Sequence, residues 1–103
     1  MDYYSKNYNI YAVIPKDTTQ KKFFIGSTKS KFENVRKQLE KCERLASNKQ
    51  SLEILKHGGI DCFDIILLKN IDSHPEELII EKSFYHDYIE NYLFVLNRLR
   101  FNV

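Results

Sequence analysis

Two short segments near the start of the chain have the pattern of β-strands. The alternation in residues 10–14 predicts a strand with two distinct faces, one of them formed by Ile10, Ala12 and Ile14. Residues 22–25 (Lys-Phe-Phe-Ile) predict a second strand that ends at Gly26, and the segment between them, residues 15–21, is polar. The two strands are therefore expected to form a β-hairpin with a long loop.

Helical spacing follows the hairpin. Ser30 and Glu33 form a capping-box pattern that predicts the start of a helix. The apolar positions of this helix recur every three or four residues, at Phe32, Val35, Leu39, Cys42 and Ala46. A second, shorter helix is predicted from Ser47 or Asn48, with Leu52 and Leu55 buried. It ends at Gly58-Gly59, because glycine suits the left-handed position after a helix.

The rest of the chain predicts one strand and one long helix. Residues 63–68 (Phe-Asp-Ile-Ile-Leu-Leu) are apolar enough for a central strand. Ser73, as a cap, and Pro75, in the first turn, predict a helix that runs to about Tyr92. The expected fold is a small α/β domain of order β-β-α-α-β-α, with residues 1–8 as a lead-in and residues 9–103 as the single domain.

Composition limits the class of protein. The 103 residues are 43% hydrophobic, which is typical of one globular domain. The longest apolar runs have five residues, so no membrane partner is expected. The start of the chain does not resemble a secretory signal, and Cys42 and Cys62 form neither a CxxC motif nor a disulfide framework. An intracellular protein without structural zinc is the simplest interpretation.

The charge is unevenly distributed along the chain. The formal net charge is +2, but residues 1–56 contain 12 Lys and Arg against 6 Asp and Glu, whereas residues 57–103 contain 4 against 8. A basic first half is typical of a face that binds a polyanion such as nucleic acid. A lysine-rich surface that is only solvated explains the same counts.

Glu81 is an unusual residue in the last predicted helix. At helical spacing it falls within an apolar stripe formed by Leu78, Tyr85, Tyr88, Ile89 and Tyr92. Removing a carboxylate from water costs several kcal/mol, more than the ~1.5–3 kcal/mol that one apolar neighbour returns. Glu81 is therefore expected to face a cationic partner or a solvent-filled cleft with a metal. A buried ion pair and a position at the rim of the stripe are the alternatives.

Arg36 flanks the apolar stripe of the first predicted helix. It lies about 80° from the centre of that stripe, where it can point along the edge of a cleft. The opposite face of the helix has three basic residues, Lys37, Lys41 and Arg44, two of which follow a glutamate at i,i+4 spacing. This basic face is typical of a solvated surface, and contact with phosphates is the alternative.

These residues, taken in order, resemble a known family. The chain is similar to GIY-YIG nucleases, and most similar to the nuclease domains of phage-type homing endonucleases. The resemblance spans roughly residues 9 to 97 and depends on Asn9-Ile10-Tyr11, Phe24-Ile25-Gly26-Ser27, Arg36, Lys56-His57-Gly58, Phe63, Leu78-Ile79-Ile80-Glu81 and Asn97. None of these motifs is specific alone, but the ordered set is.

The resemblance implies a fold and an activity. The fold would be a three-stranded antiparallel sheet flanked by helices, and the activity would be metal-dependent hydrolysis of phosphodiester bonds in DNA. Tyr11 would activate or orient the attacking water, and Arg36 would stabilise the phosphoryl charge. Glu81 would bind one divalent cation, Mg²⁺ or Mn²⁺, and Asn97 would support the site. Tyr11 could act as a base only if neighbouring positive charge lowered its pKa.

The sequence departs from the family pattern at several positions. Asn9 replaces the usual glycine, Phe24 replaces a tyrosine and removes a hydroxyl, and Glu40 replaces a histidine one turn after Arg36. Lys22 and Lys29 are the candidates to replace a lost site group and, with Phe24, to contact nucleic acid. A degenerate domain that binds nucleic acid or a protein without cutting is thus the alternative function. Sequence specificity would come from elsewhere or from a separate protein partner.

Overall fold

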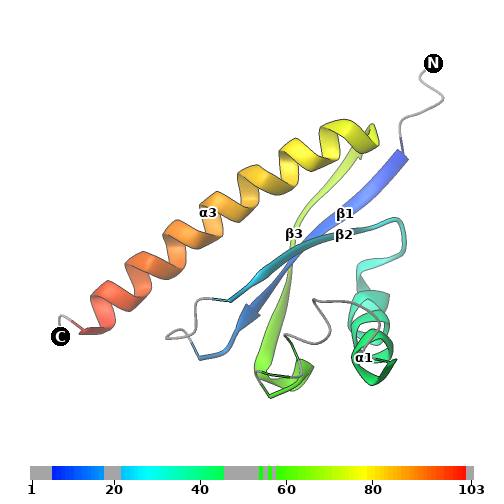
Figure 1. Ribbon diagram of the computed structural model, residues 1–103. Helices are drawn as coiled ribbons and strands as arrows, with labels where there is room; N and C mark the ends of the chain where they lie inside the picture. The colour runs from blue at the N-terminus through cyan, green and yellow to red at the C-terminus, as the bar shows by residue number, and fades with distance from the viewer. Residues whose placement is uncertain (1–5, 18–21, 46–53, 55, 57, 102–103) are drawn as a thin grey trace.

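The computed structural model describes residues 6–17, 22–45, 54, 56 and 58–101, with the backbone alone for 43–45 and 94–101. Its strands are β1 (Lys6–Pro15), β2 (Phe24–Thr28) and β3 (Phe63–Ser73). Its helices are α1 (Val35–Leu45) and α3 (Pro75–Phe101), with two short 3₁₀ turns, η1 (Phe32–Asn34) and η2 (Ile60–Cys62). The elements follow the order β-β-α-β-α, which confirms the α/β class (Figure 1).

The three strands form one antiparallel sheet in the order β2-β1-β3. β1 is central because its alternating side chains are buried on both faces, with Ile10 and Ala12 on one face and Val13 on the other. β1 begins at Lys6, so the last three residues of the expected lead-in belong to the sheet. The prediction of a central third strand was wrong. β3 is an edge strand, and Ile66 and Leu67 are nearly half exposed.

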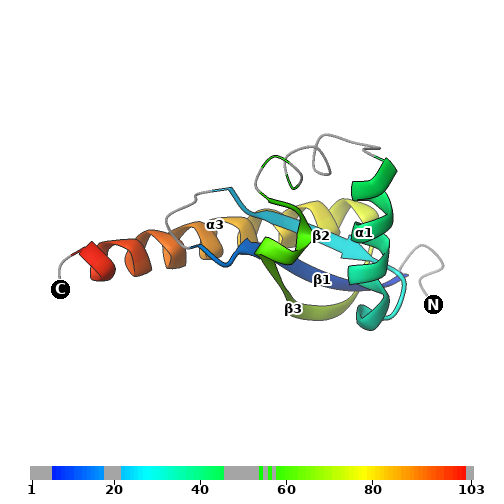
Figure 2. The ribbon, with the colours of Figure 1, turned by 90° about the horizontal axis from the view of Figure 1, so that it is seen from below.

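The helices cover opposite faces of the sheet (Figures 1 and 2). α3 packs on the face of β1 that includes Ile10, Ala12 and Ile14, through Leu78, Ile89 and Leu93. α1 lies over the other face, where Leu39 packs on the cluster around Val13, Ile54, Ile60 and Phe63. A side chain on α1 and one on α3 are thus separated by the sheet.

The start of α1 differs from the sequence prediction. The helix begins at Val35, after η1, and the N-cap of η1 is Lys31, whose side chain makes no capping hydrogen bond. Ser30 belongs instead to the turn after β2, where its backbone N–H donates to Thr28 Oγ1 at 3.1 Å. The capping box at Ser30 was therefore wrong, because this turn already uses the serine backbone.

The predicted second helix lies mostly outside the described residues, as do Leu52 and Leu55. Its predicted end is confirmed. Gly58 has a φ of 100°, and the Gly59 N–H donates to the Ile54 carbonyl at 2.8 Å. This bond across five residues is typical of a helix that ends at a left-handed glycine.

α3 begins as predicted but is longer. Pro75 is its first residue, whereas Ser73 ends β3 and its hydroxyl donates to the His74 carbonyl instead of capping the helix. The predicted end at Tyr92 was wrong, because residues 93–101 contain no glycine or proline to stop the helix. None of the described helices combines the length and the apolar character needed to cross a membrane.

Candidate functional site

Tyr11 and Gly26 face each other across the β1–β2 pair. Tyr11 is in register with Gly26, and Val13 is in register with Phe24. The Tyr11 ring lies over the glycine so closely that a Cβ at position 26 would clash with Tyr11 Cζ. The glycine of the second strand motif is thus the residue that makes room for the tyrosine of the first.

Gly26→Ala is expected to destabilise the fold by forcing this ring to move. Overpacking of this kind costs about 1–3 kcal/mol. Urea unfolding of the four proteins of a double-mutant cycle, with Tyr11→Ala as the second change, measures the coupling. Gly26→Ala should lower the free energy of unfolding clearly less in the Tyr11→Ala background than in the parent protein. An equal decrease in both backgrounds would assign the effect to the strand backbone instead.

The Tyr11 hydroxyl is in an environment that keeps it protonated. Burial raises its pKa above the usual 10.0, and the neighbouring Cys42 on α1 raises the pKa further, because a thiolate repels a phenolate. This is opposite to the lowering that a general base would need. Tyr11 is therefore suited to donate a hydrogen bond rather than to accept a proton.

This shift makes a prediction for alkaline pH. The folded pKa lies above the unfolded one, so the stability that neutral Tyr11 contributes is complete below about pH 10 and is lost as the pH rises through the folded pKa. Between about pH 9 and pH 11, the free energy of unfolding of the parent protein should fall more than that of Tyr11→Phe. Equal falls in both proteins would contradict the burial of this hydroxyl.

Phe24 lies on the same face of the sheet as Tyr11. Its ring packs against Phe63 with a centroid separation of 6.4 Å, and both belong to the cluster around Val13. At this position the chain has an apolar contact where the family has a hydroxyl. A role of Phe24 in nucleic-acid binding stays a prediction.

Arg36 is bound to two carboxylates. Its Nε lies 3.1 Å from Glu40 Oε1 within α1, and its Nη2 forms an ion pair with Asp61 in η2. The guanidinium is about half exposed, so both pairs are accessible to solvent and individually weak. A phosphate that binds Arg36 has to displace Asp61 or share the guanidinium with it.

A ladder of amide side chains extends the Tyr11 face toward the start of β1. Asn7, Asn9 and Tyr11 alternate along β1, so they share one face. Asn70 Nδ2 donates to Asn9 Oδ1 at 2.6 Å and to Asn7 Oδ1 at 2.9 Å, and Asn7 Nδ2 donates to Asp72 at 2.9 Å. Asn9 Nδ2 donates to the Ser30 carbonyl at 3.0 Å. This ladder was not predicted from the sequence, although polar residues at a period of two on both strands signal it.

Glu81 lies on α3, across the sheet from α1. It is partly buried and lines an open cavity of about 400 Å³ at the β3 edge, with Lys69, Ile71, Asp72, Ser73, Glu77 and Ile80. Its position at the rim of the buried stripe is one of the alternatives that the sequence left open. Because the sheet separates the two helices, the structure does not bring Glu81 into one cluster with Tyr11 and Arg36. Asp72 lines the cavity, but its carboxylate accepts a hydrogen bond from Asn7, which belongs to the Tyr11 face.

The remaining predicted site residues are dispersed. Lys22 and Lys29 are both exposed and lie just beyond opposite ends of β2. Asn97 is in the last part of α3, where its side chain is outside the described residues.

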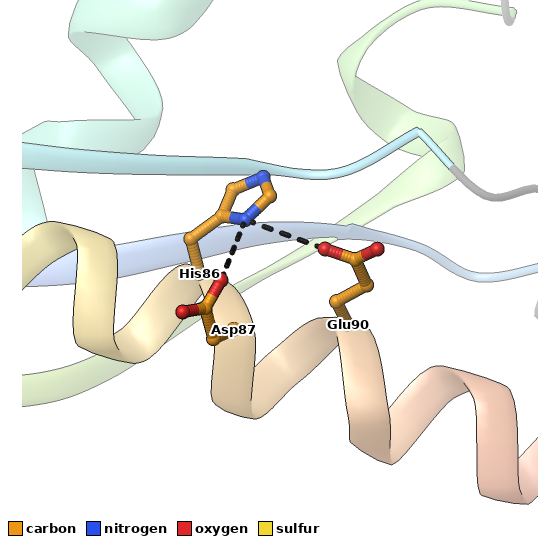
Figure 3. Close-up of side chains that lie close together, drawn as sticks. All are labelled: His86, Asp87 and Glu90. Atoms are coloured by element: carbon orange, nitrogen blue, oxygen red, sulfur yellow. Dashed lines mark ion pairs between the residues drawn. The ribbon is translucent and has the colours of Figure 1, made fainter.

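Three possible metal ligands on α3 were not found from the sequence. His86 Nδ1 lies 3.6 Å from Glu90 Oε2 and 3.9 Å from Asp87 Oδ1, and each of the three residues is exposed (Figure 3). The His86 ring also stacks on Phe23, with centroids 4.7 Å apart. The sequence signal for this cluster is a histidine followed four residues later by a glutamate. A pattern of two histidines does not include it. An ordinary surface ion pair explains the same geometry.

No protein-family model, curated protein or solved structure matches this chain. The assignment of a function therefore depends on the residues described above.

Proposed function

We propose that this chain is a metal-dependent endonuclease domain of the GIY-YIG type that hydrolyses phosphodiester bonds in DNA. The observation that supports the proposal most directly is the pairing of Tyr11 with Gly26. The two strand motifs that carry the family resemblance are thus adjacent, and their register explains why one has a tyrosine where the other has a glycine.

The face around Tyr11 has groups suited to a phosphate. The protonated Tyr11 hydroxyl can donate a hydrogen bond to a phosphate oxygen or to the attacking water. Arg36 can bind the phosphate with two parallel hydrogen bonds once Asp61 releases it. In this assignment Tyr11 positions the phosphate or the attacking water, and Arg36 stabilises negative charge on the phosphate. Neither residue removes a proton.

Glu81 and Glu77 are the residues that would hold a hard cation in this cavity, because carboxylate oxygens are the ligands that Mg²⁺ and Mn²⁺ prefer. Asp72 also lines the cavity, but its carboxylate accepts a hydrogen bond from Asn7, and among the described residues the three carboxylates do not form one cluster of ligand atoms. When bound, such an ion supplies positive charge that stabilises the negative charge developing on phosphate oxygens. Lys69 lines the same cavity and offers a further positive charge to a nearby phosphate.

One specific observation favours a second function, binding of nucleic acid without cleavage. Glu81 lies across the sheet from the helix that holds Arg36, and Arg36 already has two carboxylate partners. The absence of a hydroxyl at position 24, where the family has a tyrosine, favours the same function. A separate protein partner that provides sequence specificity is compatible with both functions.

A plasmid-nicking assay with Mg²⁺, Mn²⁺ or EDTA, combined with DNA-binding measurements at low salt, tests both functions. Nicking that EDTA abolishes supports the endonuclease. Binding without nicking supports the second function, and neither binding nor nicking rejects both.

The role of Arg36 is tested by a matched pair of charge changes. Asp61→Asn removes a carboxylate that pairs with Arg36, whereas Asp64→Asn removes one charge from an exposed position three residues away. If Arg36 contacts phosphate, Asp61→Asn should raise DNA affinity more than Asp64→Asn does. Equal effects would indicate that only net charge matters and that Arg36 has no special role.

A further inference from the structure

α3 has an exposed apolar and aromatic stripe next to the side that packs on the sheet, and the stripe begins beside the cavity at the β3 edge. Its members recur every fourth residue and are 71%, 63%, 61% and 51% exposed, at Ile80, Phe84, Tyr88 and Tyr92 respectively. Ile79 is 67% exposed as well, but it lies about 100° around the helix from Ile80 and is not part of the stripe. The sheet-facing side of the same helix buries Leu78, Ile89 and Leu93. α3 is thus apolar on two sides, and the described residues cover only one of them.

The exposed area is large for a chain of this size. A large apolar or aromatic side chain has about 150–250 Å² to bury, so the four partly exposed residues of the stripe present roughly 500 Å². That is close to the largest apolar patch of a typical monomer, about 300–600 Å². Two copies that cover the stripe mutually bury about 1,000 Å², and flanking polar residues add to this, which reaches the size of specific protein interfaces.

α3 also extends beyond the sheet. Its C-terminal part projects past the strands in both views (Figures 1 and 2). The last described side chain that α3 buries on the sheet is Leu93, eight residues before the helix ends. The sequence of the projecting part is rich in apolar residues, namely Phe94, Val95, Leu96, Leu99 and Phe101. A helix that packs along the whole of α3 would support this part, which the sheet does not reach.

The charges at the two ends of α3 favour a second copy in antiparallel orientation. The first two turns contain Glu76, Glu77 and Glu81, and the sequence places Arg98 and Arg100 near the other end. An antiparallel pair brings the acidic end of one helix to the basic end of the other, whereas a parallel pair brings like charges together. Complementary charges of this kind fix orientation and register.

We propose that this chain forms a homodimer in which the exposed stripe of α3 packs antiparallel against the same stripe of a second copy. Tyr88 is the midpoint of α3, so the two-fold axis passes beside it and Phe84 contacts Tyr92 of the second copy. Such an isologous interface uses the same patch on both copies. The proposal goes beyond the nuclease assignment and does not depend on it.

Sedimentation velocity of the full chain over a concentration range tests the dimer. The parent protein should sediment as a species of twice 12.3 kDa. Tyr88→Glu places two carboxylates against each other at the axis and should weaken the dimer at least about 100-fold, because facing like charges cost several kcal/mol. Ser83→Glu adds the same charge to an exposed position off the stripe and should leave the dimer unchanged.

Two further measurements check that the variant keeps the fold and that the two helices are antiparallel. Circular dichroism of Tyr88→Glu should match the parent protein, because Tyr88 is mostly exposed in a single copy. In a background with Cys42→Ser and Cys62→Ser, Tyr88→Cys should form a disulfide-linked dimer under mild oxidation, whereas Ile80→Cys should not.

The outcomes that overturn the proposal are distinct. A parent protein that stays monomeric at about 0.5 mM, a concentration where even weak dimers form, would show that the stripe is not used for self-association. Equal cross-linking at both cysteine positions would reject the antiparallel register. A dimer that survives Tyr88→Glu would place the interface elsewhere. None of these results depends on whether the protein cuts DNA.

Discussion

Tyr11→Phe should lower the rate of DNA nicking by about 10²- to 10³-fold, the usual effect of removing one well-placed hydrogen-bond donor from a developing charge. The hydroxyl is largely buried and its pKa is raised, so it is protonated at neutral pH and available to donate. The ring itself stays in contact with Gly26 in the variant, so the fold should be retained. Single-turnover nicking with Mg²⁺ measures the effect.

Tyr8→Phe is the matched control. Tyr8 is buried on the α3 face of the sheet and loses the same atom without altering the Tyr11 face. Its nicking rate should equal that of the parent protein. If Tyr11→Phe also nicks at the parental rate, Tyr11 has a structural role only and the proposed mechanism is wrong.

Much of the fold could be predicted from the sequence because local patterns determine it. The alternation around Ile10 to Ile14 identified the strand that became the centre of the sheet, and Gly58 identified the end of a helix. The position of β3 could not be predicted in this way. An apolar run such as residues 63–68 is typical of a strand buried on both faces, but strand order is set by long-range pairing, which left Ile66 and Leu67 at a free edge.

The candidate site was predictable only in part. The hairpin that contains Tyr11 and Gly26 follows from two short strand patterns, whereas the ion pair of Arg36 with Asp61 joins residues 25 positions apart and has no local signal. The prediction of which side of α3 packs on the sheet was also wrong in part. Tyr88 and Tyr92 were expected in the buried stripe, but the sheet covers Ile89 and Leu93 and leaves both tyrosines exposed. This rotation places Glu81 at the rim of the stripe, over the cavity.

Glu81→Gln should abolish both DNA nicking and divalent-cation binding at the cavity while leaving the fold intact. Glutamine keeps the shape of the side chain but removes the charge that a hard cation requires. Because Glu81 is only partly buried and shares the cavity with Asp72 and Glu77, removal of one carboxylate should maintain or slightly raise the melting temperature. Isothermal calorimetry with Mn²⁺, thermal unfolding and the nicking assay measure the three effects.

Glu90→Gln is the control that separates the two possible metal sites on α3. It leaves the cavity unchanged and removes one of the two carboxylates that cluster with His86. If Glu81 binds the metal used in catalysis, Glu90→Gln should nick DNA and bind Mn²⁺ as the parent protein does. Loss of Mn²⁺ binding in Glu90→Gln alone would move the metal site to His86. A large fall in the melting temperature of Glu81→Gln would show instead that Glu81 stabilises the fold through an ion pair. Lys69 is the basic residue that lines the same cavity, so it would be the partner in that pair.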